Sequence, residues 1–160
     1  MNRKGEIGMT IREVTPADRA MWLKLRLELW PGNEAEHGED IDRYFSPRRA
    51  EPLMTLVAAD ADGTLCGFAE LSIRLYAEGC LSDHVGYLEG WFVSPSHRKR
   101  GVGRALIDAS MRWAREQGCT EFASDTEWDN MESAKAHAAC GFEEAGVIRC
   151  FRRSIEGHLT

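Results

Sequence analysis

The chain has 160 residues, a length typical of a single folded domain, and 43% of them are hydrophobic and 29% charged. No apolar run reaches the roughly 18 residues of a membrane-spanning helix, and the N-terminus lacks the hydrophobic segment of a secretory signal. The net charge of −6 disfavours nucleic-acid binding, which needs a basic face, and favours a cationic partner. We therefore expect a globular protein that binds neither nucleic acid nor membrane.

The chain has five cysteines, an odd number, and no two of them form a C-x-x-C pair. This pattern argues against a disulfide framework and against a structural zinc site. It is typical of the reducing cytoplasm, where a free cysteine is usually a small buried hydrophobe. We therefore expect a cytoplasmic location and no metal centre.

Hydrophobic periodicity and turn signals predict strands and helices with no internal repeat and no linker. Thr15 and Pro16 mark a helix start, with the threonine as N-cap and the proline in the first turn. In chain order the predicted elements are a strand at 10–14, helices at 16–29 and 41–45, strands at 54–59, 65–75 and 87–93, a helix at 101–117, a strand at 120–124, a helix at 130–139 and a strand at 147–152. This order predicts an α/β fold with a mixed sheet covered by helices.

An acidic run follows the first predicted helix and contains Glu34, Glu36, Glu39, Asp40 and Asp42. Such a run is usually a solvated loop or helix face. The alternative is a segment that attracts a polycation by electrostatic steering.

The segment with the most chemical information is Arg98-Lys99-Arg100-Gly101-Val102-Gly103, which lies between a predicted strand and a long amphipathic helix. Gly101 and Gly103 let a ligand approach the backbone, and the N–H groups of a helix N-terminus favour an anion. The basic residues, continued by Arg104, add positive charge. The segment lacks the Walker A pattern, and Leu106 stands where a dinucleotide fingerprint needs a third glycine. It suits a pyrophosphate; a basic turn that only caps the helix is the structural alternative.

This segment resembles the acyl-CoA pyrophosphate loop of the GNAT N-acetyltransferase superfamily. The preceding strand, Glu89 to Val93, is similar to the family's strand beside the pantetheine arm, where a bulge splays it from its parallel neighbour, here residues 120–124. The run from Asn130 to Cys140 resembles the family's second coenzyme motif. The resemblance implies a GNAT fold over about residues 10–153, with helices on both faces of a mixed central sheet and splayed parallel strands that form the acetyl-CoA cleft.

The same resemblance implies that residues 1–160 form one N-acetyltransferase domain. Met9 lies just before the first predicted strand, so we expect residues 1–9 to be a flexible N-terminal extension, the alternative being that translation starts at Met9. In this family, backbone N–H groups in the gap between the strands bind the acetyl carbonyl. An oxyanion site of this kind can supply a few kcal/mol of transition-state stabilisation.

A narrower resemblance is to aminoglycoside 6′-N-acetyltransferases. It rests on the segments Leu29-Trp30-Pro31, Gly67-Phe68-Ala69, Ser72-Ile73-Arg74, Leu88-Glu89-Gly90, Ala123-Ser124-Asp125-Thr126 and Gly141-Phe142-Glu143-Glu144. It implies transfer of acetyl from acetyl-CoA to the 6′-amine of an antibiotic, and hence resistance. The residues that match the aminoglycoside site are Trp30, Tyr76, Glu89 and Asp125. Those that match acetyl-CoA positions are Trp91, Phe92, Val93, Arg98, Lys99, Arg100, Gly101, Val102, Gly103, Arg104 and Asn130.

The chemistry of these residues agrees with the resemblance. An aminoglycoside is a polyhydroxylated polycation, so its site needs carboxylates, here Glu89 and Asp125, and flat apolar surface, here Trp30 and Tyr76. Attack of an amine on a thioester needs a proton acceptor, and such general-base help is commonly worth about 10²–10⁴-fold in rate. Glu89 and Asp125 are therefore the catalytic candidates, directly, through water, or as anchors that fix the amine.

Each of these side chains also has a structural alternative. Asp125 can cap a turn, Glu89 can face solvent at a strand edge, and Trp30 can belong to the core. Tyr76 can be an ordinary strand-end residue, and Asn130 can be only a helix N-cap.

Two departures from the family pattern concern the C-terminal part of the chain. Many members have a tyrosine that protonates the leaving thiolate, whereas the nearest candidate here is His137. We favour the alternative that His137 is a packed or exposed helix residue. Gly146 stands where the subfamily often has a further acid of the antibiotic site.

Two other functions remain open at this point. One is a GNAT enzyme that acetylates a polyamine, another small amine or a protein N-terminus. The other is a non-catalytic acyl-CoA-sensing domain, which would keep the basic loop but would not need Glu89 and Asp125. The subfamily resemblance also suggests a homodimer, joined through the predicted strand at 147–152.

Overall fold

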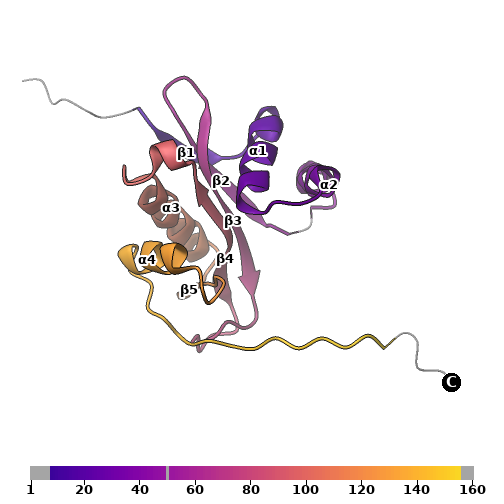
Figure 1. Cartoon of the computed structure of the whole chain (residues 1–160), viewed down its shortest axis with the longest axis vertical. Coiled ribbons are helices and arrows are strands. Elements are labelled where there is room, and N and C mark those ends of the chain that lie inside the picture. Colours follow the sequence, from indigo (N-terminus) through magenta and orange to yellow (C-terminus); the bar gives the residue numbers. More distant parts are fainter. Residues whose placement is uncertain (1–7, 50, 156–160) are drawn as a thin grey trace, which may run out of the picture. The chain divides into compact units, whose positions relative to one another are not determined.

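A computed structural model describes residues 8–49 and 51–155 (Figure 1). Its helices and strands follow the predicted order as far as the last helix. They are β1 (Thr10–Glu13), the 3-10 turn η1 (Pro16–Asp18), α1 (Arg19–Leu29), α2 (Glu34–Phe45), β2 (Met54–Ala59), β3 (Leu65–Arg74), β4 (Val85–Val93), the 3-10 turn η2 (Pro95–His97), α3 (Val102–Glu116), β5 (Glu121–Ser124) and α4 (Met131–Ala139). No helix in the described ranges is long and apolar enough to cross a membrane.

The chain divides into two compact units. The first unit ends at Asp125 and contains the whole sheet with α1, α2 and α3. The second unit begins at Thr126 and contains α4 and the segment after it. That all 160 residues act as one domain stays a prediction, and most of the expected N-terminal extension lies outside the described residues.

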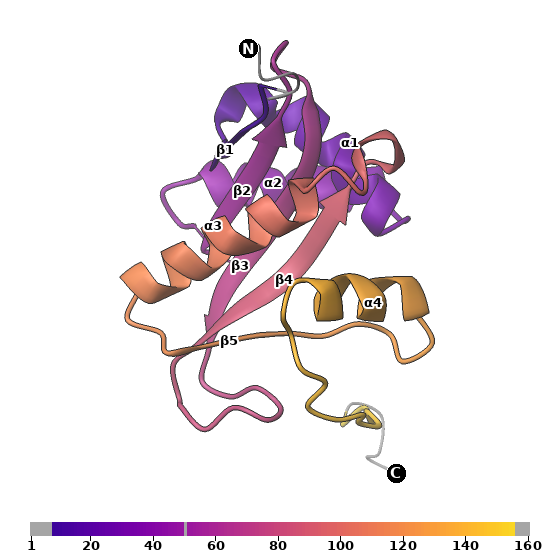
Figure 2. The ribbon, with the colours of Figure 1, turned by 90° about the vertical axis from the view of Figure 1, so that its left-hand side faces the viewer.

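The first unit is a five-stranded mixed sheet with helices on both faces. The strands lie in the order β1-β2-β3-β4-β5, antiparallel throughout except that β5 runs parallel to β4. The pair α1 and α2 covers one face, and α3 lies across the other (Figures 1 and 2). This is the α/β architecture that the element order predicts.

The two sheet faces have different packing partners. On the α1–α2 face, Trp22 and Tyr44 are fully buried edge to face, with ring centroids 5.2 Å apart, in one cluster with Phe68 of β3. On the other face α3 buries Leu106 and approaches the sheet at Gly86, where an added Cβ would lie 2.6 Å from the Ala114 methyl carbon. The helix can lie this close to β4 only because residue 86 has no side chain.

One extra residue in β4 changes the pairing of the two central strands. Glu70 of β3 lies opposite Gly90, but the next residue, Leu71, lies opposite Leu88. Glu89 is therefore the additional residue of a β-bulge, a feature that bends a strand and re-aims its side chains. The bulge occurs in the strand where the sequence resemblance implied one.

Two parts of the structure differ from the sequence prediction. Helix α2 begins at Glu34 rather than near Ile41, because Asn33 caps it by accepting a hydrogen bond from the Ala35 N–H at 3.0 Å. The whole acidic run thus lies in a helix, in which Asp42 pairs with Arg19 of α1.

The prediction of a strand at 147–152 is wrong for the part of the chain that the structure describes. Residues 143–155 contain no strand, and Val147, Ile148 and Phe151 are exposed. A strand needs a neighbour for its backbone hydrogen bonds, and the described part of this chain supplies none to that segment.

A buried carboxylate fixes the start of α1. Asp18 accepts two hydrogen bonds from the Arg12 guanidinium, at 2.7 and 2.9 Å, and further bonds from the backbone and hydroxyl of Thr15, both at 2.8 Å. The hydrogen bonds from Arg12, together with those from Thr15, lower the pKa of Asp18 to about 2. Strand β1 is therefore tied to the first turn of the helical layer.

We expect Asp18→Asn to lower the free energy of unfolding by about 2 kcal/mol at neutral pH, because the ionised carboxylate holds both partners. The folded-state pKa lies below the ordinary value of 3.8, so this contribution exists above that value and disappears as the pH falls toward about 2. Urea unfolding of both proteins between pH 7 and pH 3 measures the difference. A difference that does not shrink below pH 4 would contradict this account.

Candidate active site

The first element of the site is the end of the pairing between β4 and β5. The last residues paired are Leu88 with Ser124, and β4 continues from Glu89 to Val93 beyond that point. This part of β4 pairs only with β3 among the described strands, so its other edge presents backbone N–H and C=O groups. The splayed parallel strands implied by the sequence are present, and they open at the bulge.

The bulge residue carries its charge into a polar cluster on the α1–α2 face. The Glu89 carboxylate accepts two hydrogen bonds from Arg74, from Nε at 2.9 Å and from Nη2 at 2.6 Å, and a third from the Ser72 hydroxyl. The Glu89 side chain is 23% exposed. It therefore neither faces open solvent nor lacks a countercharge, and most of its hydrogen-bonding capacity is used within the protein.

A second carboxylate joins this cluster through an aromatic ring. The Arg74 guanidinium lies 3.5 Å from the centre of the Tyr87 ring, and the Tyr87 hydroxyl donates to Asp125 Oδ2 at 2.7 Å. Burial, with the hydrogen bond to Asp125, raises the pKa of Tyr87, so the phenol stays protonated as a donor. Asp125 is exposed at the end of β5, so its carboxylate can also meet a ligand.

Trp30 lies directly against the bulge. It follows the last residue of α1, and its backbone N–H donates to the Arg26 carbonyl at 2.7 Å. An added Cβ on Gly90 would lie 2.3 Å from Trp30 Cη2, so the ring occupies the space that a side chain would need. Trp30 also packs on the core through Phe68. Trp30 therefore packs on the edge of the core, as the structural alternative has it, and also lies next to the bulge where the sequence predicts a substrate site.

The basic loop turns directly into the N-terminus of α3. Lys99 has a φ of 59° and Gly101, the N-cap, a φ of 83°, so the chain passes through left-handed conformations before the helix begins. Arg98 donates from Nε to the Val93 carbonyl at 2.9 Å, which fixes the loop to the end of β4. The first amides of α3 and the exposed side chains of Lys99 and Arg100 surround one helix N-terminus. This arrangement favours an anionic group.

A pair of ionisable side chains holds the turn before this loop. His97 Nε2 lies 2.8 Å from Asp60 Oδ2, and His97 Nδ1 lies 2.9 Å from the Ser96 hydroxyl. His97, Asp60 and Cys66 form the one group in the described ranges whose possible ligand atoms suit a metal, all of them within 4.8 Å of one another. Burial, aided by the charge of Asp60, raises the pKa of the Cys66 thiol, which disfavours the thiolate that a metal needs. We therefore assign this group to positioning η2.

The structure brings most of the predicted substrate residues together at the bulge, but not Tyr76. Trp30, Glu89 and Asp125 lie around the bulge, and Trp91 to Val93 form the edge of β4 beyond it. Tyr76 lies in the loop after β3, 66% exposed, with Glu78 as its hydrogen-bond partner, and is not part of the cluster around Glu89. Its contact with an acceptor stays a prediction.

Two predicted or considered residues belong to the second unit. Asn130 is the N-cap of α4, where its side chain accepts from the Ser133 N–H at 3.0 Å, so its capping role is confirmed and its coenzyme contact stays a prediction. His137 Nδ1 lies 2.8 Å from the Ser133 carbonyl, and the ring packs edge to face on Phe142. These contacts favour the reading of His137 as a packed helix residue.

Sequence reasoning did not assign Ser72, Arg74 and Tyr87 to the site. A usable signal existed in β3, since Glu70, Ser72 and Arg74 alternate along a strand and must share one face. The contact between Tyr87 and Asp125 joins residues far apart in sequence and has no comparable local signal.

Comparison with known proteins identifies the family. The model of the acetyltransferase (GNAT) family matches residues 19–142. The chain belongs to this family. Its relatives include the aminoglycoside N(6′)-acetyltransferase type 1 of Klebsiella aerogenes, which is 51% identical over 146 residues and covers 91% of this chain and 96% of that protein.

Solved structures agree with this assignment. The aminoglycoside N-acetyltransferase AAC(6′)-Iy in complex with CoA superposes with a TM-score of 0.85 and 40% identity, over 96% of this chain and 99% of that one. A second structure of AAC(6′)-Iy, with a bisubstrate analogue that joins CoA to acetylneamine, gives a TM-score of 0.79 and 42% identity, over 91% and 98%. The chain is thus an acetyl-CoA-dependent acetyltransferase. That its loop at α3 holds the coenzyme pyrophosphate stays a prediction.

We expect Gly103→Ala to weaken coenzyme binding even though alanine is the better helix former. An added Cβ would lie 2.9 Å from Trp91 Cζ2, so either the ring or the start of α3 must move. The KM for acetyl-CoA should rise about tenfold while the KM for the acceptor changes less than about twofold. Steady-state kinetics measure both, and an unchanged melting temperature would show that the effect is local. An unaltered KM for acetyl-CoA would contradict this role of the loop.

Proposed function

We propose that this protein transfers the acetyl group of acetyl-CoA to the 6′-amine of an aminoglycoside antibiotic and thereby confers resistance. The observation that carries the proposal is the cluster at the bulge, where Glu89, Asp125 and Trp30 lie beside the point at which β4 and β5 separate. Acidic groups beside the half-buried ring of Trp30 suit a polycationic sugar. The relatives named as aminoglycoside 6′-N-acetyltransferases support the same acceptor.

The two substrates approach from different elements. The N-terminus of α3, with Lys99, Arg100 and Arg104 around it, would hold the pyrophosphate of the coenzyme. The edge of β4 from Glu89 to Val93 that lies beyond the pairing with β5 would receive the pantetheine arm and direct backbone N–H groups at the thioester carbonyl. The acceptor amine would then reach the thioester from the face that carries Asp125.

The two carboxylates have different roles in this proposal. Glu89 is already held by Arg74 and Ser72, so it serves to anchor the cluster and to add negative charge for the cationic acceptor. Asp125 is exposed and has one oxygen bound to Tyr87, so it is the group that takes the amine proton, directly or through one water. The amine nitrogen then bonds to the carbonyl carbon, the C–S bond breaks, and coenzyme A leaves as a thiolate. We assign no dedicated acid to that thiolate, since His137 is engaged by Ser133.

Another amine remains the alternative acceptor within the same chemistry. The cluster of Glu89 and Asp125 would also attract a polyamine, whereas a protein N-terminus would not need two carboxylates. A sensing domain without catalysis would have no use for either carboxylate at the gap. We therefore rank an aminoglycoside first and a polyamine second.

A thiol-release assay with acetyl-CoA distinguishes these acceptors. We expect release with kanamycin and tobramycin, because both carry a 6′-amine on a polycation, and little or none with spermidine or a peptide. Release with spermidine and none with any aminoglycoside would overturn the proposed acceptor. No release with any amine would overturn catalysis itself.

The role of Asp125 has its own test. Asp125→Asn keeps an oxygen that can accept from Tyr87 but cannot take a proton, so kcat/KM for the acceptor should fall about 10²–10³-fold. Calorimetric binding of acetyl-CoA should change less than about twofold. Asp108→Asn, an exposed acid on α3, is the matched control and should change neither. Equal losses in turnover and coenzyme binding would contradict the assigned role.

We further propose a homodimer in the cytoplasm. The C-terminal segment exposes Val147, Ile148 and Phe151 together, and a second copy of the chain would cover them and supply the strand neighbour that the described chain lacks. A cytoplasmic location fits five free thiols, two of which are buried.

A further inference from the structure

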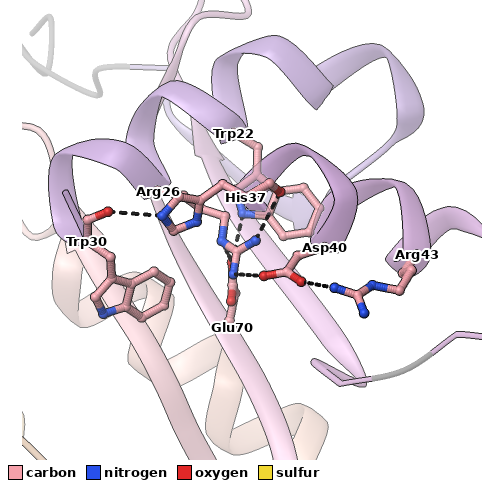
Figure 3. A network of polar contacts seen from close by, with 7 residues as sticks. All are labelled: Trp22, Arg26, Trp30, His37, Asp40, Arg43 and Glu70. Carbon is pink, nitrogen blue, oxygen red and sulfur yellow. Dashed lines mark hydrogen bonds and ion pairs between the residues drawn. The ribbon is translucent and has the colours of Figure 1, made fainter. Parts of the chain in front are cut away.

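A buried ion pair lies beside the Trp30 ring and has no part in the reaction steps proposed for the site. Arg26 of α1 and Glu70 of β3 have side chains only 9% and 4% exposed, and Arg26 Nε lies 3.0 Å from Glu70 Oε1 (Figure 3). Glu70 Oε1 also accepts from the Trp22 indole N–H at 3.0 Å. Charges at this depth are costly to desolvate, and well-packed apolar residues in such places are often as stable or more so. Stability alone therefore does not account for the pair.

The pair is centred on the bulge. Glu70 lies directly opposite Gly90, the last pairing before the register shifts, and the Trp30 ring lies against Gly90. The Arg26 guanidinium carbon is 5.4 Å from the centre of the Trp30 ring and 5.9 Å from that of Trp22. One cation thus contacts both indoles while Glu70 holds it from the sheet side.

Trp30 is also fixed at its backbone by the same group of residues. Its carbonyl lies 3.0 Å from His37 Nε2, and Arg26 Nη1 donates to the His37 carbonyl at 3.4 Å. On the side of α2, Asp40 Oδ2 lies 3.6 Å from Arg26 Nη2, so Arg26 lies between a buried acid, Glu70, and a half-buried one, Asp40 (Figure 3). Arg26 contacts both acids at once, with Glu70 the closer and more deeply buried partner.

We propose that Arg26 and Glu70 form a positioning pair that holds the Trp30 ring on the bulge and so sets the acceptor site's affinity for a sugar ring. This inference rests on the proposed function, since Trp30 serves there as the apolar wall of the acceptor site. The pair touches neither substrate and acts only through Trp30. Burial raises the pKa of Glu70 to about 7, against the opposing effects of Arg26 and Trp22, so the pair is best tested above that pH.

The decisive variant is Glu70→Gln. It keeps the shape of the side chain and an acceptor for the Trp22 N–H, but it removes the negative charge that competes with Asp40 for the Arg26 guanidinium. About one pH unit above the pKa of Glu70, we expect the KM for the aminoglycoside to rise about tenfold, with kcat and the KM for acetyl-CoA within about twofold. Asp18→Asn is the control, because it removes another buried carboxylate that pairs with an arginine, at the opposite end of α1. It should lower stability and leave the acceptor KM unchanged.

A double-mutant cycle separates positioning from a general structural role. In a Trp30→Leu background, Glu70→Gln should change the acceptor KM less than about twofold, since its effect passes through the missing ring. A tenfold rise in both backgrounds, or no rise with Trp30 present, would overturn the inference.

Acrylamide quenching of the Trp30 fluorescence is a readout that does not depend on catalysis. The Trp30 signal is the difference in fluorescence between a protein that has Trp30 and the same protein with Trp30→Leu. Quenching of this signal should increase in Glu70→Gln, because the ring is released toward solvent, and unchanged quenching would overturn the inference. A wild-type protein that releases no thiol with any aminoglycoside would overturn the proposed function instead.

Discussion

One extra residue in β4 determines where the rest of the site lies. Glu89 has no partner of its own in β3, and past it β4 no longer pairs with β5. A bulge at this position bends the strand, opens one edge of its backbone, and turns a carboxylate toward Arg74. Gly90 must follow it, because the Trp30 ring occupies the space where its side chain would be. The coenzyme edge, the acidic cluster and the aromatic wall are three consequences of the same irregularity.

The charges around the bulge are arranged so that one acid remains available. Glu70 is paired with Arg26 and Glu89 with Arg74, whereas Asp125 receives a hydrogen bond from a neutral phenol. A neutral donor fixes the position of a carboxylate without cancelling its charge. Asp125 thus combines a defined orientation with the ability to accept a proton from a cationic substrate, which neither of the other two acids offers.

Local signals in the sequence were sufficient for much of this structure. Gly101, the basic residues before it and the amphipathic helix after it predict the anion site, because a helix N-terminus is built from consecutive residues. The placement of Asp125 at a strand end follows in the same way from the pattern of β5. The bulge at Glu89 came from family resemblance, since nothing in its own composition marks one residue as extra.

What sequence reasoning missed depends on contacts between distant segments. The pairs of Arg74 with Glu89, Tyr87 with Asp125, and Arg26 with Glu70 each join different elements. Alternation along β3 places Glu70 and Arg74 on one face of the sheet, but it does not identify the partner of either residue. Helix α2 starts earlier than its hydrophobic pattern predicts, because the Asn33 side chain caps it at a position where no large apolar residue marks the helix. The predicted strand at 147–152 shows the opposite error, since strand propensity is realised only where a neighbouring strand exists.

The central claim is that this site delivers acetyl to one particular amine. Two-dimensional NMR of the product formed from acetyl-CoA and kanamycin tests it most directly. The account predicts a single monoacetylated product with the new amide at the 6′ nitrogen. Acetyl on another amine, a mixture of positions, or no acetylated kanamycin at all would contradict it.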